Sequence, residues 1–135
     1  MFLAATSVTW TVPPPAWIQT DPLVTRTVDI LVFNRSTQVH LKWNYILSAG
    51  SQLLSTTFSI FTEGSSNDIG VKFPGSGTPT IFNSFRARFN ISTSEVATLI
   101  INKATEREET TFQCKVTTSS NVWQYRVRLK LTGKN

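Results

Sequence analysis

Few residues of this chain are of the types that perform catalysis or bind metal ions. The sequence contains one histidine, His40, and one cysteine, Cys114, so a zinc site or a Cys–His nucleophile would lack most of its parts. His40 lies beside Lys42 on the outward side of an alternating segment, which favours a solvated residue over a general base. Four acidic residues are not spaced as a metal-ligand set: Asp29, Glu63, Asp68 and Glu95. The sequence therefore predicts no enzyme, no metal site and no cofactor.

The single cysteine cannot form a disulfide within the chain. Three alternatives stay open for Cys114: a buried apolar thiol, a reactive thiol, or half of an intermolecular link. Burial is the commonest fate of a free cysteine in a strand.

The charge of the chain is basic, because 13 Lys and Arg outnumber 8 Asp and Glu to give a formal net charge of +5. Only Arg126, Arg128 and Lys130 are clustered. Scattered cations favour a solvated basic surface over a nucleic-acid site. Binding of a polyanion or glycan by these three residues stays open as an alternative function.

Alternating apolar and polar residues predict strands along most of the chain. In residues 39–45, for example, Val39, Leu41, Trp43 and Tyr45 share the inward side. The expected strands are 7–12, 24–33, 39–45, 57–61, 69–73, 79–85, 85–91, 96–101, 111–117 and 123–131, with a helical turn at 105–108. Three prolines at 13–15 make the first strand an edge strand. No apolar run reaches 18 residues, so no segment is expected to span a bilayer.

A chain of 135 residues fits one domain. We expect residues 8–131 to form that domain and 132–135 to be a tail. Residues 1–7 are apolar without a charged beginning, as in a remnant of an export signal or an artificial start. Two N-glycosylation sequons, at Asn34 and Asn90, fall where the alternation points the side chain to solvent, which favours secretion.

The stretch from Arg88 to Val116 organises the rest of the chain, because it reads as two strands, a polar corner and a third strand. The inward positions of these strands carry apolar residues, among them Leu99, Ile101, Phe112 and Cys114. Arg88 is placed to reach Glu108 across the corner.

Together with Leu41 and Trp43, this stretch resembles a V-type domain of the immunoglobulin superfamily, over roughly residues 24–131. The resemblance implies an all-β, antiparallel, immunoglobulin-like sandwich with Greek-key connections. It also places Phe58 near the usual position of the core tryptophan.

Three features depart from the immunoglobulin pattern. Trp43 stands where the first cysteine is usual, Phe112 replaces the corner tyrosine, and residues 123–131 lack the Gly-x-Gly bulge, so an antigen receptor is not expected. Fibronectin type III domains, which also carry a tryptophan at this strand position, are the structural alternative.

The missing bridge between positions 43 and 114 would contribute about 4 kcal/mol on the chain-entropy model. A buried tryptophan removes roughly 150–250 Å² from water, which is about 4–6 kcal/mol before entropy costs. We therefore expect Trp43, packed over Cys114 as a core pair, to compensate for the absent disulfide.

Within the superfamily, the chain is most similar to the membrane-distal domain of the hydroid (cnidarian) Alr allorecognition receptors, which bind like to like between opposing cells. This resemblance implies an extracellular recognition or adhesion domain of a larger membrane-anchored receptor. Its partner would be a protein, and a second copy of the chain is one candidate.

The strands at 57–61, 111–117 and 123–131 are expected to present a basic face with an exposed aromatic and with Gln113 pointing outward. The candidate partner-binding residues are Phe61, Lys115, Asn121, Trp123, Arg126, Arg128 and Lys130. Asn121 and Trp123 enter through the resemblance, because this turn commonly mediates pairing of V-type domains. A like-with-like contact needs acids opposite the arginines, with Glu106, Glu108 and Glu109 as the expected source, or an apolar contact.

Overall fold

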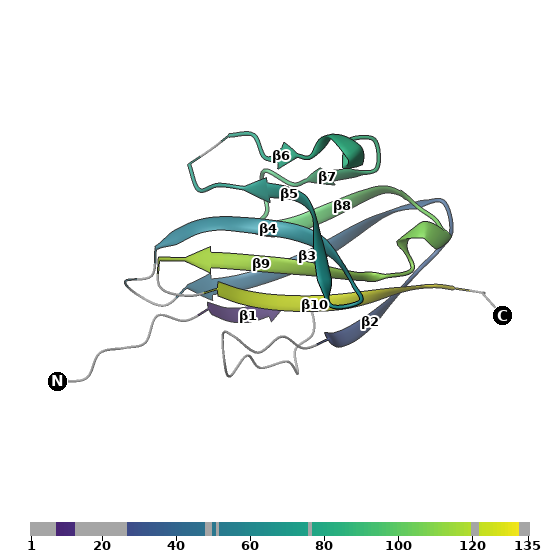
Figure 1. Cartoon of the computed structure of the whole chain (residues 1–135), viewed down its shortest axis with the longest axis horizontal. Helices are drawn as coiled ribbons and strands as arrows, with labels where there is room; N and C mark the ends of the chain where they lie inside the picture. Colours follow the sequence, from purple (N-terminus) through teal and green to yellow (C-terminus); the bar gives the residue numbers. More distant parts are fainter. Residues whose placement is uncertain are drawn as a thin grey trace.

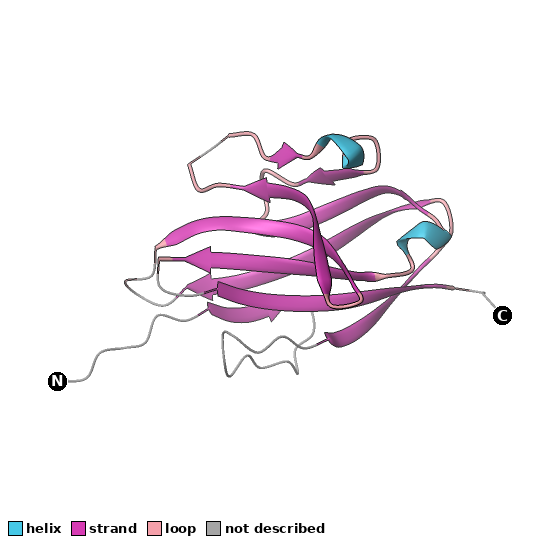
Figure 2. Cartoon of the chain, viewed as in Figure 1, coloured by secondary structure: helices cyan, strands magenta, loops and turns pink. Residues whose placement is uncertain are grey.

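Two β-sheets packed face to face make up the fold (Figure 1). The computed structural model describes residues 8–12, 27–47, 50, 52–75, 77–119 and 122–132, with side chains described from residue 31 onward. Strands make up nearly all of the ordered elements, and two short 3-10 helices complete them (Figure 2). No helix in these ranges is long and apolar enough to cross a bilayer.

The smaller sheet has the strand order β1-β3-β8-β7 and the larger sheet the order β2-β10-β9-β4-β5-β6. The smaller sheet contains β1 (Val8–Val12), β3 (Thr37–Leu47), β8 (Ala97–Ala104) and β7 (Phe89–Ile91). The larger sheet contains β2 (Thr27–Phe33), β10 (Val122–Leu131), β9 (Thr111–Thr118), β4 (Leu53–Thr62), β5 (Ser65–Lys72) and β6 (Thr80–Ile81). Each strand pairs antiparallel with its neighbours except β2, which runs parallel to β10.

Each expected strand has a counterpart, but the region 79–91 differs from the expectation. The 3-10 helix η1 (Asn83–Phe85) and a turn through residue 88 replace most of the strand expected at 85–91. Phe85 and Phe89 are four residues apart, a helical spacing, and their rings meet edge to face with centroids 5.7 Å apart. Residues 24–26 of the strand expected at 24–33 lie outside the described residues.

The strand expected at 69–73 is longer than its sequence pattern indicates, because β5 begins at Ser65. Glu63 (φ 51°) and Gly64 (φ 79°) both adopt positive φ, as the two central residues of a type I′ turn do. This turn pairs Thr62 with Ser65 and makes β4 and β5 a tight hairpin.

Inward positions of both sheets form one core. In β10, side chains alternate between buried and more exposed positions from Trp123 to Leu131. Trp43 on the smaller sheet is 2% exposed and Cys114 on the larger sheet 0%. The Trp43 ring lies 5.8 Å from that of Phe58, which pairs directly with Cys114 across β4 and β9. Both members of the expected core pair therefore belong to the same core, whereas their direct contact stays a prediction.

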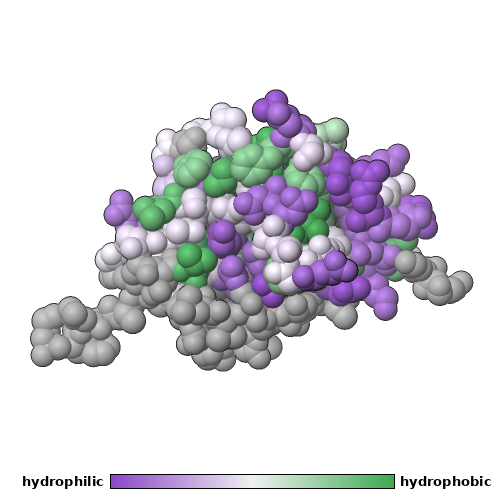
Figure 3. Space-filling model, viewed as in Figure 1, coloured by the Kyte–Doolittle hydropathy of each residue, from purple (hydrophilic) through white to green (hydrophobic). Residues whose placement is uncertain are grey.

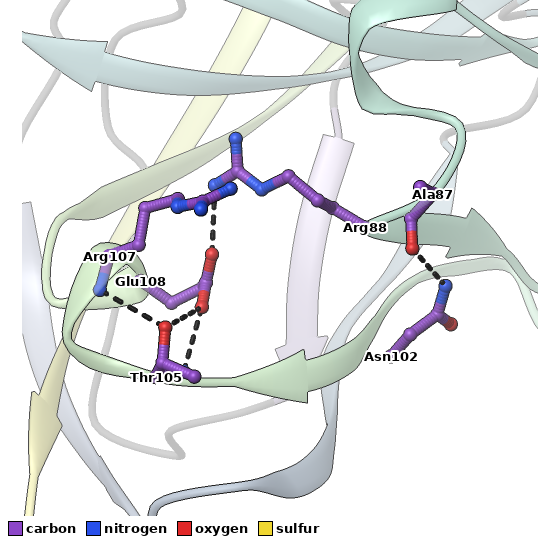
Figure 4. A network of polar contacts seen from close by, with 6 residues as sticks. All are labelled: Ala87, Arg88, Asn102, Thr105, Arg107 and Glu108. Carbon is purple, nitrogen blue, oxygen red and sulfur yellow. Dashed lines mark hydrogen bonds and ion pairs between the residues drawn. The ribbon is translucent and has the colours of Figure 1, made fainter.

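The corner between β8 and β9 holds an ion pair between buried Glu108 and partly buried Arg88 (Figure 4). The 3-10 helix η2 (Glu106–Glu108) begins with a capping box, in which the Glu108 Oε1 accepts hydrogen bonds from the backbone N and the Oγ1 of Thr105. The other Glu108 oxygen accepts from Arg88 Nη2 at 2.8 Å. The Arg88 guanidinium also lies 4.9 Å from the centroid of the Phe89 ring. This network joins the turn before β7 to the corner, as expected from the sequence.

Candidate recognition face

We call the solvent side of β4, β5, β9 and β10 in the larger sheet the outer face. Its centre is built by cross-strand neighbours: Arg126 on β10 lies opposite Gln113 on β9, and Phe61 on β4 lies opposite Ser66 on β5. Because side chains alternate along each strand, these residues share the side away from the core.

Arg126 is held in place by residues of β9 and β4. Its guanidinium carbon lies 3.3 Å from the centroid of the Phe61 ring, and its Nε donates a hydrogen bond of 2.9 Å to Gln113 Oε1. Gln113 Nε2 in turn donates to Ser66 Oγ at 3.2 Å. A chain of contacts thus crosses all four strands of the outer face.

The positive charge of Arg126 is not compensated by any residue whose side chain the structure describes. Among these residues the ion pairs are Arg35–Glu106, Lys42–Glu95 and Arg88–Glu108. Partial burial lowers the pKa of Arg126, because removal from water disfavours the charged form. The outer face therefore carries a partly desolvated cation whose terminal nitrogens have no hydrogen-bond partner among the described residues.

The acidic residues expected to oppose the arginines are occupied elsewhere. Glu106 pairs with Arg35, Glu108 is buried against Arg88, and Glu109 accepts a hydrogen bond from the backbone N of Leu131. Each of these carboxylates already has a partner within the chain, so their contact with the arginines of a second copy stays a prediction. Two other acids lie on the β4–β5 hairpin: Asp68, which accepts from Ser59, and exposed Glu63.

Two expected surface residues lie below the surface. Trp123 is 5% exposed, because it shares the inward side of β10 with Tyr125 and Val127, so its proposed role in partner contact is wrong. Gln113 is 1% exposed, because Arg126 and Phe61 lie on the same face and Arg126 binds its amide. Phe61 is partly buried under the guanidinium rather than a bare exposed aromatic.

The remaining candidates differ in exposure. Lys115 is partly buried, whereas Arg128 and Lys130 are exposed on β10. Asn121 lies outside the described residues.

Sequence reasoning did not identify the exposed apolar side chains of the larger sheet. Leu54, Phe73 and Phe82 are 45%, 50% and 40% exposed at or next to β4, β5 and β6. Figure 3 shows apolar side chains mainly over the left part of this view, where β4, β5 and β6 lie, and hydrophilic ones to the right. The sequence signal for Leu54 is its neighbour Leu53, because strict alternation cannot bury two adjacent leucines. The structure has a register irregularity between Leu53 and Ser55.

The two sequon asparagines are exposed and lie away from the outer face. Asn90 is on β7 of the smaller sheet, where its Oδ1 accepts a hydrogen bond from the backbone N of Ile91. Asn34 lies between β2 and β3, where its Oδ1 accepts from Thr132 Oγ1 at 2.6 Å.

The structure also decides between the alternatives for Cys114. The thiol is fully buried and unpaired, and burial raises its pKa well above the ordinary value. A buried, protonated thiol is neither a nucleophile nor accessible for an intermolecular link. Among the described residues, no group of three or more His, Cys, Asp or Glu side chains is placed to hold a metal ion.

Comparisons with known proteins identify the fold. No protein-family profile matches the chain, and no curated protein matches it in sequence. The structure of murine CRIg matches with a TM-score of 0.64 and 16% identity, covering 78% of this chain and 94% of that chain. A chain of the structure reported as "Structural basis of T cell specificity and activation by the bacterial superantigen toxic shock syndrome toxin-1" matches with a TM-score of 0.65 and 10% identity, covering 94% and 99%.

The two packed sheets and these neighbours define an immunoglobulin-like β-sandwich, which confirms the fold class expected from the sequence. At such low identity the likeness concerns the fold alone, and one fold serves many functions.

Proposed function

We propose that residues 8–131 form a V-type recognition domain of an extracellular, membrane-anchored receptor of the Alr kind, and that it binds a second copy of itself through the outer face. The strand order supports the V-type assignment, because β5 and β6 extend the larger sheet beyond β4, as the two additional strands of variable-type domains do.

The observation that carries this proposal is that the strands of the outer face and the hairpin joining two of them carry charges of both signs. Arg126 lies on β10, and Glu63 lies at the tip of the β4–β5 hairpin. Neither has an ion-pair partner among the described residues. In a two-fold symmetric pair the same patch meets itself, so the cationic part of one copy can face the acidic part of the other. This arrangement removes the repulsion expected of a uniformly basic face.

The positions of the sequons support the same face. If Asn34 and Asn90 carry glycans, the sugars occupy the smaller sheet and the end of the sandwich and leave the outer face free. The exposed apolar side chains Leu54, Phe73 and Phe82 supply the desolvated area that a specific contact needs.

A charge-exchange experiment tests the proposal. Arg126→Glu and Glu63→Arg are each expected to abolish self-association of the purified domain, measured by sedimentation and by aggregation of coated beads. An equimolar mixture of the two variants restores association, because both contacts of the symmetric pair then join opposite charges. Lys103→Glu, an equal change of charge at an exposed position of the smaller sheet, is the matched control. A wild-type domain that remains monomeric at high concentration and aggregates no beads would refute self-recognition.

The second candidate function is binding of a polyanion or a glycan. It is favoured by the outward row of Arg126, Arg128 and Lys130 along β10. Retention of the domain on a heparin column should then fall when all three charges are reversed. Retention that persists in the reversed variant eliminates this candidate.

A further inference from the structure

The setting of Arg126 points to a more specific property of the outer face. We propose that Arg126, with Phe61 and Gln113, is a preorganised receptor for a side-chain carboxylate of the partner protein, and that it determines partner specificity. This inference rests on the proposed function in one respect, that the outer face contacts a protein.

The first argument is the donor geometry. A guanidinium offers five N–H donors in a rigid fork, and the one on Nε donates to Gln113 Oε1. The remaining donors, on the two terminal nitrogens, have no partner among the described residues. A carboxylate is the planar anion whose two oxygens match this fork.

The second argument is that the side chain is already ordered. A free arginine loses rotamer freedom when it binds, which weakens the contact. Here the stack on Phe61 and the bond to Gln113 hold the guanidinium before any partner arrives, and Gln113 is itself fixed by Ser66. Arg128 and Lys130 are exposed, and no comparable contact with a described side chain holds them.

The third argument selects the source of the carboxylate. Partial burial of the guanidinium favours a single planar anion that also brings apolar surface, because Leu54, Phe73 and Phe82 lie on the same sheet. A protein segment with an Asp or Glu side chain meets both requirements. A highly charged polyanion would depend instead on Arg128 and Lys130, which are freely hydrated.

Gln113→Glu is the decisive variant, because it supplies an internal carboxylate. The new side chain can accept from Arg126 Nε and from the Ser66 hydroxyl, so every buried partner remains satisfied. We expect the midpoint of thermal unfolding to rise and self-association to weaken by about tenfold or more, since the internal carboxylate then neutralises the positive charge that attracts the carboxylate of the partner. Gln52→Glu, the same change at an exposed position before β4, should alter neither quantity.

Arg126→Lys tests whether association depends on the guanidinium fork or only on the positive charge at this position. Lysine keeps the positive charge but lacks the fork, so association should again weaken by about tenfold, while Arg128→Lys has little effect. Equal association of wild type, Gln113→Glu and Arg126→Lys would overturn the inference and leave recognition by the outer face intact.

A direct measurement does not depend on self-association. The Nε–H of Arg126 is followed by NMR during titration with N-acetyl-glutamate methylamide, with the glutamine analogue as the uncharged control and sodium sulfate as the polyanion-like probe. We expect a saturable shift with the glutamate compound that is absent in Gln113→Glu.

The outcomes of this titration distinguish the proposals. If the Nε–H signal of Arg126 does not shift, or shifts equally with the glutamine analogue, the inference that Arg126 is a carboxylate receptor is overturned. An equal shift with sulfate at matched ionic strength overturns carboxylate selectivity and favours polyanion binding. A glutamate-specific shift in a domain that stays monomeric supports the receptor while refuting self-recognition.

Discussion

Trp43 and Cys114 belong to facing sheets of one core. The sequence predicts that they stand where a disulfide joins the two sheets of a usual immunoglobulin domain. Trp43 meets the ring of Phe58, and Phe58 is the cross-strand neighbour of Cys114. At the scale of the residue, we therefore predict that the packing of Trp43 and Phe58 compensates for the absent covalent link. The side chains of Trp43 and Cys114 differ greatly in the apolar surface they bury.

Truncation of each side chain should therefore have unequal effects. Trp43→Ala is expected to lower the free energy of unfolding by about 3–5 kcal/mol, a large part of the roughly 5–15 kcal/mol of an ordinary domain. Cys114→Ala removes one sulfur atom and should cost about 1 kcal/mol. Urea unfolding followed by tryptophan fluorescence or circular dichroism measures both values. Similar losses for the two variants would contradict the central role of Trp43.

At the scale of the element, the turn of the β4–β5 hairpin carries a residue that is unfavourable for the stability of the turn but useful for the proposed function. Position 63 has φ of 51°, a conformation that favours Asn or Gly, yet it holds Glu63. Strained residues often cluster at binding sites. The glutamate is explained if its carboxylate contacts Arg126 of a second copy.

Replacement at this turn tests that explanation. Glu63→Asn should raise the free energy of unfolding by about 0.5–1 kcal/mol, because asparagine tolerates positive φ, and should weaken self-association. Glu63→Gln removes the charge without relieving the backbone, so it should weaken association at unchanged stability. Stability is measured by urea unfolding and association by sedimentation. A stabilised Glu63→Asn domain that associates normally would exclude Glu63 from the contact.

At the scale of the whole molecule, the buried ionisable groups make the fold sensitive to alkali. Burial raises the pKa of the Cys114 thiol, and burial likewise raises the pKa of the Tyr45 hydroxyl, which bonds to Thr56 Oγ1 at 3.0 Å. When the pKa is higher in the folded state, the unfolded chain releases its proton first as the pH rises. Stability is then retained below the unfolded pKa and lost above it.

The free energy of unfolding should consequently fall as the pH rises above about 8.5, the ordinary thiol pKa, by up to about 1.4 kcal/mol per pH unit from Cys114. A second decrease should begin near pH 10, where tyrosine in the unfolded chain titrates. Urea unfolding between pH 7 and 10.5 measures the slope. Cys114→Ala should lack the first decrease, and an unchanged slope in this variant would refute its assignment to the thiol.

Local alternation by itself determined the strands, the inward residues and the polar corner of this protein. A strand repeats every two residues, so a pattern such as Leu41, Trp43 and Tyr45 specifies its buried side without knowledge of the partner strand. The Arg88–Glu108 pair was also predicted from the sequence, although it joins the turn before β7 to the corner between β8 and β9.

Only the tertiary structure decided which outward residues meet one another. Gln113 and Ser66 are 47 positions apart, and their contact depends on the register of β4 with both β5 and β9. The same register lays Arg126 over Phe61 and buries Gln113, although period-two alternation places all three outward. Alternation specifies the side of a sheet but not the neighbour across the strands, so the receptor on the outer face became visible only when the sheet was assembled.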